Sequence, residues 1–359
     1  MVSFFTQWYK RKFSDPHAVT LLVILLSIFL FIYFFSSLLM PVFVAIAIAF
    51  LLDLPVNRLS NMGLSRSLSS TIVVMLFVGI TLIASFGLMP VMWQQGSNLI
   101  QEIPHMVTEG QSYLLTLPEK YPEMVKAEQI ESVLGFVKSN FIEWGQLVLK
   151  ASLNSISDIV ALLIYLILVP LMVFFFLKDK QQFLQSFAAL LPKDREMAVQ
   201  VGNEMNQQIM NYIRGKVIEI IIIGAASTIT FALLGLNYAL LLGVLVGLSV
   251  LVPYVGATIV TLPVLLVALF QWGPGAEFGY VMLAYAIIQA LDGNLLVPIL
   301  FSEAVNLHPV VIIIAVILFG GLWGFWGVFF AIPLATLVKA VITAWSNPKF
   351  QLSDITPPE

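Results

Sequence analysis

The sequence predicts an all-α polytopic membrane protein with about eight transmembrane segments. Three observations predict this class: 60% of the 359 residues are hydrophobic, only 10% are charged, and the mean hydropathy is +0.98. An ordinary soluble domain is roughly 45–50% apolar and about 25% charged. A water-soluble core cannot hide this surplus of apolar side chains, whereas a lipid bilayer accommodates it at about 20 residues for each spanning helix.

The charge, the cysteine content and the motifs exclude several other classes of protein. Lys and Arg number 17 against 20 Asp and Glu, and no block of like charges would suit nucleic acid. Cys is absent, which excludes disulfides, zinc–cysteine sites and thiol catalysis. No phosphate-binding loop, His-Glu-x-x-His motif or Gly-x-Ser-x-Gly motif occurs, so we expect no enzyme, no cofactor, no metal and no ATPase on this chain.

Residues 1–92 are expected to form three transmembrane helices. The apolar stretch Ala18–Leu52 is too long for one helix across about 30 Å of hydrocarbon. We expect Pro41 to mark the start of a second segment. The interval Asp53–Ser67 is polar and contains two arginines, so it is expected to be a cytoplasmic connection. The third crossing is then expected from Leu68 to Met92.

The middle of the chain contains two polar regions separated by one apolar segment. Residues 93–153 are acidic and repeat apolar side chains at helical spacing, which predicts an extracytoplasmic amphipathic helical region. Residues 154–177 are expected to form a transmembrane helix. Residues 178–216 are rich in Lys and Arg, which places them in the cytoplasm. Their spacing indicates amphipathic helices that either lie along the membrane or form a solvated linker packed on the bundle.

Residues 217–345 are expected to form a transmembrane bundle with interrupted helices. Residues 346–359 are expected to form a cytoplasmic tail. Two apolar runs in this bundle, Tyr238–Gln271 and Pro309–Trp345, resemble each other because a Gly- or Pro-containing turn breaks each of them. Interrupted helices at matching places are typical of transport sites. Each run is interpreted either as a re-entrant hairpin or as one kinked span. Both interpretations place the N- and C-termini in the cytoplasm.

Asp292 is the strongest candidate for a functional residue in the apolar part of the sequence. An acid at membrane depth costs roughly 2.5–3.5 kcal/mol on insertion scales, so it usually faces a partner, a cavity or a transported ion. Gln289 lies three residues earlier and is expected on the same helix face. The alternative is that Asp292 and Gly293 form only a hydrated break near one interface.

Other polar or irregular positions are weaker candidates for a transport path or gate. Glu219 either serves as a gate or pairs with nearby cations at the interface. His308 either titrates between pH 5 and 8 or caps the helix that follows it. The turn at Pro253, Tyr254 and Gly256 either offers backbone groups to a ligand or is a structural kink.

Two pairs of glycines have the four-residue spacing that lets membrane helices approach closely. The first pair is Gly243 and Gly247, and the second is Gly320 and Gly324. We expect these glycines to serve helix packing rather than transport. The packing is expected either within one protomer or between protomers.

Several blocks of the sequence together form a recognisable pattern. They are Asp292–Pro298, Leu307–Pro309, Gly320–Gly324 with Gly327 and Pro333, Val252–Gly256, and Pro41–Leu52. Taken together, these blocks resemble the signature of the autoinducer-2 exporter family, also called PerM-type permeases. The resemblance implies a homo-oligomer in a bacterial cytoplasmic (inner) membrane. It also implies either export of the quorum-sensing signal autoinducer-2 or exchange of sodium or lithium for protons.

The resemblance also marks candidate path or gate residues in the matching blocks. These are Asp292, Asn294, Pro298, Pro253 and Gly256. In many relatives Glu occupies the place of Asp292. The shorter acid keeps the charge but changes its reach.

Three functions stay open from the sequence. The first is a secondary transporter or facilitator that exports a small polar organic solute across the bilayer. The second is an antiporter in which Asp292 alternately holds a proton and a monovalent cation. The third is a non-transporting scaffold whose outer and cytoplasmic helices recruit partners.

Overall fold

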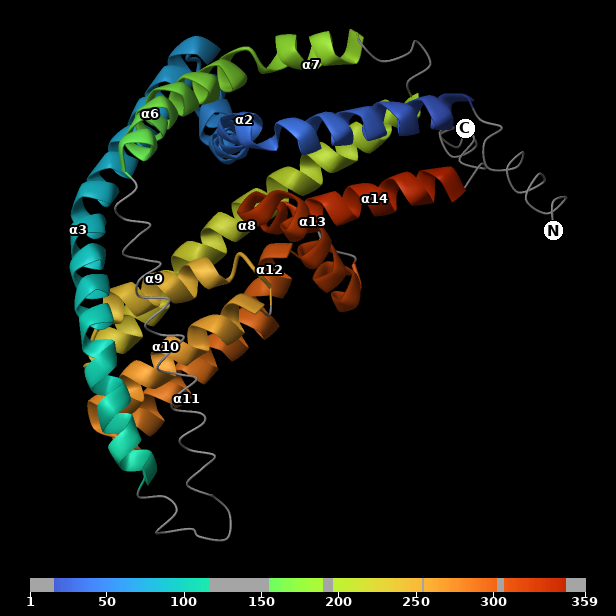
Figure 1. The fold of residues 1–359 in the computed structure, drawn as a ribbon. Coiled ribbons are helices and arrows are strands. Elements are labelled where there is room, and N and C mark those ends of the chain that lie inside the picture. The colour runs from blue at the N-terminus through green and yellow to red at the C-terminus, as the bar shows by residue number, and fades with distance from the viewer. Residues whose placement is uncertain (1–15, 116–154, 190–195, 254, 302–306, 347–359) are drawn as a thin grey trace, which may run out of the picture. The chain divides into compact units, whose positions relative to one another are not determined.

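A computed structural model describes residues 16–115, 155–189, 196–253, 255–301 and 307–346. Every regular element in these ranges is a helix (Figure 1). The elements are α2 Pro16–Asn61, α3 Arg66–Leu115, α6 Ser155–Lys178, α7 Lys180–Ala189, α8 Glu196–Leu233, α9 Ala239–Ser249, α10 Val255–Trp272, α11 Ala276–Leu291, η1 Asp292–Leu296, α12 Val297–Phe301, α13 Pro309–Phe329 and α14 Ala331–Ser346. The prediction of an all-α protein is confirmed for these ranges.

The lengths of the helices agree with a protein that crosses a membrane several times. In the described ranges, six helices are long and apolar enough to span: Leu38–Asn61, Arg66–Glu102, Asn206–Leu233, Val255–Trp272, Ala276–Phe301 and Pro309–Phe329. Two shorter apolar helices are Ile164–Lys178 and Ala239–Ser249. The sequence predicted about eight segments, and six of full length with two shorter ones are found here.

The chain divides into two compact units, each assembled from separate segments. Unit 1 comprises Met1–Val74, Val169–Val217 and Val297–Glu359. Unit 2 comprises Met75–Leu168 and Ile218–Leu296.

The N-terminal helices differ from the predicted ones in where they bend and end. The kink in α2 lies at Phe35 (φ −109°, ψ 16°), and Pro41 remains inside the helix. A proline disturbs the carbonyl four residues before it, so the distortion is expected upstream of the ring. The polar connection is also shorter than predicted, because α2 continues to Asn61 and α3 begins at Arg66.

Two further predicted boundaries fall inside unbroken helices. We predicted that a crossing ends at Met92, but α3 is 50 residues long and continues past Met92 to Leu115. We predicted that a membrane segment begins at Val217, but α8 runs from Glu196 to Leu233. Backbone hydrogen bonding does not depend on side-chain polarity, so a change from polar to apolar sequence need not end a helix. Residues 116–154, most of the predicted outer region, lie outside the described residues.

Unit 1 contains the second interrupted run as a tight helical hairpin. The chain reverses at Gly324, which has φ 60°. Gly327 then packs on the end of the first limb, where a Cβ would lie 1.8 Å from the carbonyl oxygen of Phe319. α13 also contacts α2, and the rings of Phe29 and Trp323 lie 5.2 Å apart.

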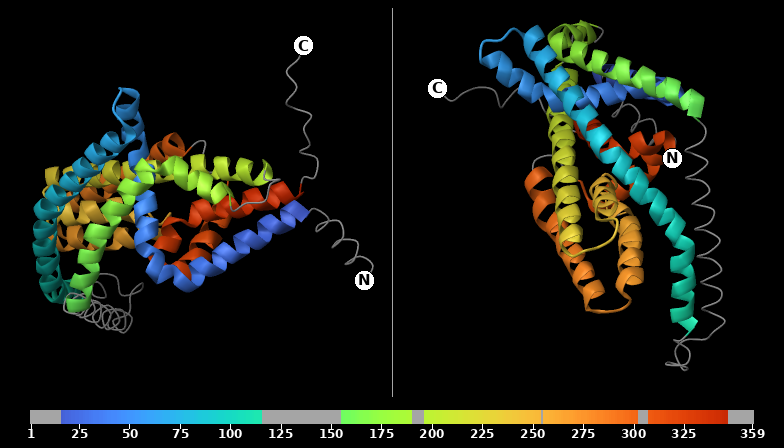
Figure 2. Two further views of the ribbon diagram at one scale, coloured as in Figure 1. Left: turned by 90° about the horizontal axis from the view of Figure 1, so that it is seen from above. Right: turned by 90° about the vertical axis from the view of Figure 1, so that its left-hand side faces the viewer.

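Unit 2 contains the first interrupted run, and its core is apolar. α9 ends at Ser249 and α10 begins at Val255, so the helix is interrupted where the sequence predicted. α10 packs against both α9 and α11 (Figure 1), and Figure 2 shows the loop that joins α10 to α11. The core of this unit consists of buried side chains that include Phe231, Leu242, Val246, Val264 and Val281.

Side chains from α3 and α10 accept hydrogen bonds from backbone amides at the start of α9. The Gln95 side chain accepts a hydrogen bond from the amide of Leu241 at 2.9 Å. Gln271 accepts from the amide of Asn237 at 2.7 Å. The hydroxyl of Tyr238 donates to the carboxylate of Glu102. Burial, with that hydrogen bond and the negative charge of Glu102, raises the pKa of Tyr238 to about 12.

Candidate transport site

The candidate site centres on a local π-helix in the span that carries Asp292. α11 passes at Asp292 into the five-residue π-helix η1, which is followed by α12. π-helical turns are rare, and they interrupt the regular α-helical pattern of backbone hydrogen bonds. They occur frequently at functional sites. The side chain of Asn294 donates to the carbonyl of Ala290 at 2.8 Å. This carbonyl therefore has a hydrogen-bond partner where the backbone pattern changes from α to π.

Asp292 is buried inside this span. The residue is 9% exposed, although its neighbours Gly293, Asn294 and Leu295 are exposed. The sequence raised the alternative of a merely hydrated break, and the buried position of Asp292 favours the functional interpretation. A buried carboxylate is costly unless other groups compensate its charge or it binds a proton.

A row of polar side chains leads along α11 away from Asp292. Tyr285, Gln289 and Asp292 are spaced by four and three residues, so they share one face of the helix. The Gln289 side chain lies beside the hydroxyl of Tyr285. That hydroxyl is 3.0 Å from the hydroxyl of Thr261 on α10, and it donates to the carbonyl of Ala257 at 3.3 Å.

This row provides alternating hydrogen-bond donors and acceptors inside an apolar bundle. Tyr285 is 3% exposed, and Asp292 is nearly as well buried. Buried hydroxyl, amide and carboxyl groups on facing helices suit the recognition of a solute that carries its own hydroxyl or carbonyl groups. We name Thr261, Tyr285, Gln289 and Asp292 the polar row. Sequence reasoning found the last two and missed the first two, since a single Thr or Tyr in an apolar helix gives no local signal.

The predicted turn residues have a simpler structural role in the described residues. Around Pro253, the turn contains hydrogen bonds from Val252 to Ser249 at 3.1 Å and from Gly256 to Val252 at 2.9 Å. A Cβ on Gly256 would lie 1.8 Å from the carbonyl oxygen of Ser249, so close packing requires glycine here. Tyr254 lies outside the described residues. These bonds satisfy backbone groups within the turn, which favours a structural kink.

The other predicted path residues are distributed over both units. Glu219 is 1% exposed on α8, in unit 2 with the polar row. Pro298 is exposed on α12, and His308 is exposed before α13, both in unit 1. The His308 ring accepts a hydrogen bond from the amide of Val310 at 3.3 Å. This contact is that of a helix cap, one of the two roles considered for His308.

Of the four glycines predicted to serve helix packing, three lie at close contacts and one lies in a turn. In unit 2, a Cβ on Gly243 would lie 2.1 Å from Thr228 Oγ1, and one on Gly247 would lie 2.7 Å from the carbonyl oxygen of Ile220. In unit 1, a Cβ on Gly320 would meet the side chain of Val328 at 2.8 Å. Gly324 differs from the prediction, because a Cβ built on it would meet nothing within 4 Å and its positive φ makes the hairpin turn.

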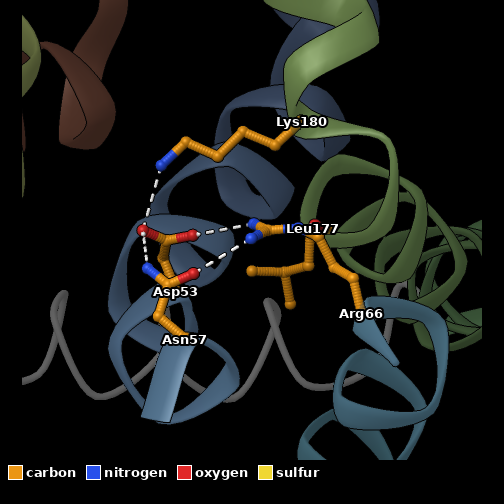
Figure 3. Close-up of polar contacts among 5 residues, drawn as sticks. All are labelled: Asp53, Asn57, Arg66, Leu177 and Lys180. Carbon is orange, nitrogen blue, oxygen red and sulfur yellow. Dashed lines mark hydrogen bonds and ion pairs between the residues drawn. The ribbon is translucent and has the colours of Figure 1, made fainter. Parts of the chain in front are cut away.

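Sequence reasoning missed a charged cluster in unit 1, which Figure 3 shows. Asp53 is 4% exposed near the end of α2. Its carboxylate accepts from Lys180 at 3.0 Å, from Asn57 at 3.0 Å and from Arg66 at 3.3 Å. Arg66 also donates to the carbonyl of Leu177 at 2.8 Å. The cluster therefore joins the end of α2, the start of α3 and the junction of α6 with α7.

Lys216 is a second charged residue that the sequence did not single out. It is 4% exposed on α8, and its ammonium lies 5.1 Å from the ring centroid of Phe301. A cation over an aromatic face gains electrostatic stabilisation that increases when water is excluded. The Phe301 ring also fits against Gly215, where a Cβ would lie 2.6 Å from it.

The repeated membrane spans, the two interrupted helices and the buried acid in a π-turn define a polytopic membrane transporter. Comparison with known proteins gives the family. A family model described as AI-2E family transporter matches residues 22–347. The chain belongs to this family, and the resemblance seen in the sequence is confirmed.

Similar proteins occur in several bacteria. A protein of Escherichia coli (strain K12) named as a permease, PerM, is 55% identical over 347 residues, which cover 97% of this chain and 98% of that protein. A protein of Bacillus subtilis (strain 168) named as a transport protein, YueF, is 27% identical and covers 86% of this chain and 85% of its own length. A transport protein of Thermotoga maritima is 22% identical over 95% of this chain.

Proposed function

We propose that this protein is a secondary transporter that exports a small polar organic solute of the autoinducer-2 type. The observation that carries the proposal is the buried Asp292 in a π-turn, on one helix face with Gln289 and Tyr285. The family description supports export of such a solute, and the polar row supplies the hydrogen-bonding groups that a polyhydroxylated molecule requires.

The first interrupted run, in the same unit as the polar row, supports alternating access around that row. α9 has 11 residues and α10 has 18, so at 1.5 Å per residue α9 reaches only about 16 Å. A helix of that length cannot cross about 30 Å of hydrocarbon. Although α10 alone is long enough to span, α9 is not, so the two limbs cannot both cross. The first run is proposed to be a re-entrant hairpin that moves relative to α11. The second run, in unit 1, is also proposed to be a re-entrant hairpin.

The remaining features of the proposal concern the membrane and the assembly. The bacterial relatives support the inner membrane, and the basic residues of 178–216 support a cytoplasmic position for that region. Both termini are then cytoplasmic if the number of crossings is even. A homo-oligomer, which the family resemblance implies, remains a prediction.

The test is efflux from proteoliposomes loaded with autoinducer-2 as the probe solute. Wild-type protein is expected to release the probe faster than protein-free vesicles. Asp292→Asn keeps the size of the side chain but removes its charge and its ability to accept and release a proton. A hydrogen bond to a charged group is worth roughly 1.5–3 kcal/mol, so we expect the rate to fall about ten- to a hundredfold.

Asp179→Asn is the matched control, because Asp179 lies between α6 and α7 and outside the polar row. It is expected to leave efflux unchanged. Equal efflux by wild type and Asp292→Asn would refute the role given to Asp292. Absence of probe efflux, combined with proton flux driven by sodium or lithium gradients, would replace the proposal with cation exchange. Absence of both in correctly folded protein would favour the scaffold.

A further inference from the structure

Helix α7 is exposed along most of its length, although it carries large apolar side chains. Residues 181–186 are all exposed, and they include Phe183 at 39% and Leu184 at 58%. The side chains of Gln182 and Leu184 are two positions apart, so they point to nearly opposite sides of the helix. Exposed apolar side chains on one side of a short helix require an apolar surrounding, and this protein lies in a membrane.

Cations gather near the base of α7, where Lys178 and Lys180 flank its start and Arg66 donates to the carbonyl of Leu177. The described segments 53–70 and 174–189 contain four cations, Arg58, Arg66, Lys178 and Lys180, and two carboxylates. Arg58 and Lys178 are exposed, while the Arg66 and Lys180 side chains are each about 30% exposed. This corner of unit 1 therefore has an excess of positive charge beside an apolar helix face.

The Asp53 cluster fixes two of these cations in place. Asp53 is almost fully buried, and it binds Lys180 through one oxygen and Arg66 through the other. Arg66 is also held by Asn57, whose side-chain oxygen accepts from it at 3.0 Å. One buried carboxylate cannot neutralise two cations, so the outer sides of Arg66 and Lys180 remain positive and oriented.

Aromatic rings lie beside Lys178 and beside α7. The Lys178 ammonium lies 5.8 Å from the ring centroid of Phe174 and 5.9 Å from that of Phe175. The Phe183 ring of α7 contacts Phe176 of α6 with centroids 5.6 Å apart. A cation beside aromatic rings and exposed apolar side chains matches the boundary between lipid headgroups and acyl chains.

We propose that this corner binds the phosphodiester headgroups of anionic phospholipids, and that α7 lies in the membrane interface with Phe183 and Leu184 in the acyl region. The excess of positive charge selects an anionic lipid over a zwitterionic one. The apolar side chains select a lipid over free inorganic phosphate, which would leave them in water. The cluster at Asp53 then fixes α7 at the depth of the headgroups.

The absence of cysteine makes a direct test possible. Leu184→Cys and Gln182→Cys each introduce one thiol for an environment-sensitive fluorophore, in nanodiscs of phosphatidylcholine with or without phosphatidylglycerol. The label at 184 is expected to emit at shorter wavelength and to be quenched by acyl-chain quenchers. The label at 182, on the other side of α7, is expected to report water. Equal water exposure at both positions would overturn the position proposed for α7.

Measuring how much lipid stays bound to the purified protein tests whether the cations bind anionic headgroups. We expect native mass spectrometry to show phosphatidylglycerol on the wild type and weaker retention by Lys178→Gln and Arg58→Gln, neither of which belongs to the Asp53 cluster. The expected loss is about fivefold for each cation, equivalent to roughly 1 kcal/mol. Lys339→Gln, on α14, is the control and should change nothing. The proposal fails if retention is equal for both lipids, or if inorganic phosphate displaces the bound lipid.

Discussion

Gly247→Ala is expected to destabilise the protomer by overpacking α8 and α9. A Cβ at this position would lie 2.7 Å from the carbonyl oxygen of Ile220 and 2.8 Å from Cα of Gly224. Both distances are below the 3.4 Å at which ordinary contact begins. The obstructing atoms belong to the backbone, so no side chain can rotate away and the two helices must separate.

The expected loss is about 1–3 kcal/mol, the usual cost of forcing an extra carbon into a packed interface. That range corresponds to a 5- to 150-fold change in the unfolding equilibrium. Equilibrium unfolding in mixed micelles, followed by tryptophan fluorescence, measures the difference. The seven tryptophans of the chain supply the signal.

Gly279→Ala is the matched control for this prediction. Gly279 lies on a membrane helix like Gly247, but nothing is found within 4 Å of its ideal Cβ. The control should be neutral or stabilising by up to about 1 kcal/mol, since alanine is the better helix former. If both variants unfold alike, the close approach of α8 and α9 is refuted. If Gly247→Ala alters only the oligomeric state, the glycines pack between protomers instead.

Two other predictions concern charged and titrating contacts. Asp53→Asn leaves the cations Arg66 and Lys180 facing a neutral side chain, and we expect a loss of about 1–2 kcal/mol because both cations are partly exposed. Lys180→Gln, which keeps the Asp53–Arg66 pair, should cost less in the same unfolding assay, and the reverse order would contradict the cluster. Tyr238 has its pKa raised from 10.0 to about 12, so its contribution to stability is complete below pH 10 and is lost as pH rises through 12. A phenolate absorbance titration should show a late-titrating component that is smaller by one tyrosine in Tyr238→Phe.

The class of fold and the two interruptions could be predicted from the sequence because they depend on composition and local residue type. Apolar content determines that the chain enters a bilayer. The breaks fall near Pro253, Gly256 and Gly324, where proline removes an amide donor and glycine permits a tight turn, although Pro41 shows that a proline alone need not end a helix. An isolated acid in an apolar run is equally visible, which is why Asp292 was identified.

The contacts between distant segments could not be predicted in this way. Lys180 lies 127 residues after Asp53, and the carbonyl of Leu177 lies 111 residues after Arg66. The sequence around Asp53 has the composition of a polar loop, and only the packing of α2 against its neighbours makes it a buried helical residue. The partnership of Thr261 with Tyr285 is likewise set by the packing of α10 on α11.

The two interrupted runs share one packing feature at their turns. In each, a glycine near the start of the returning limb packs directly on a carbonyl at the end of the first limb: Gly256 on Ser249, and Gly327 on Phe319. A Cβ would lie 1.8 Å from the oxygen in both places. Such turns are much tighter than a simple connection between two spans requires. Two tight helical turns at matching places in the sequence are consistent with the re-entrant hairpins proposed above, which would have to meet their backbone hydrogen bonds within the membrane.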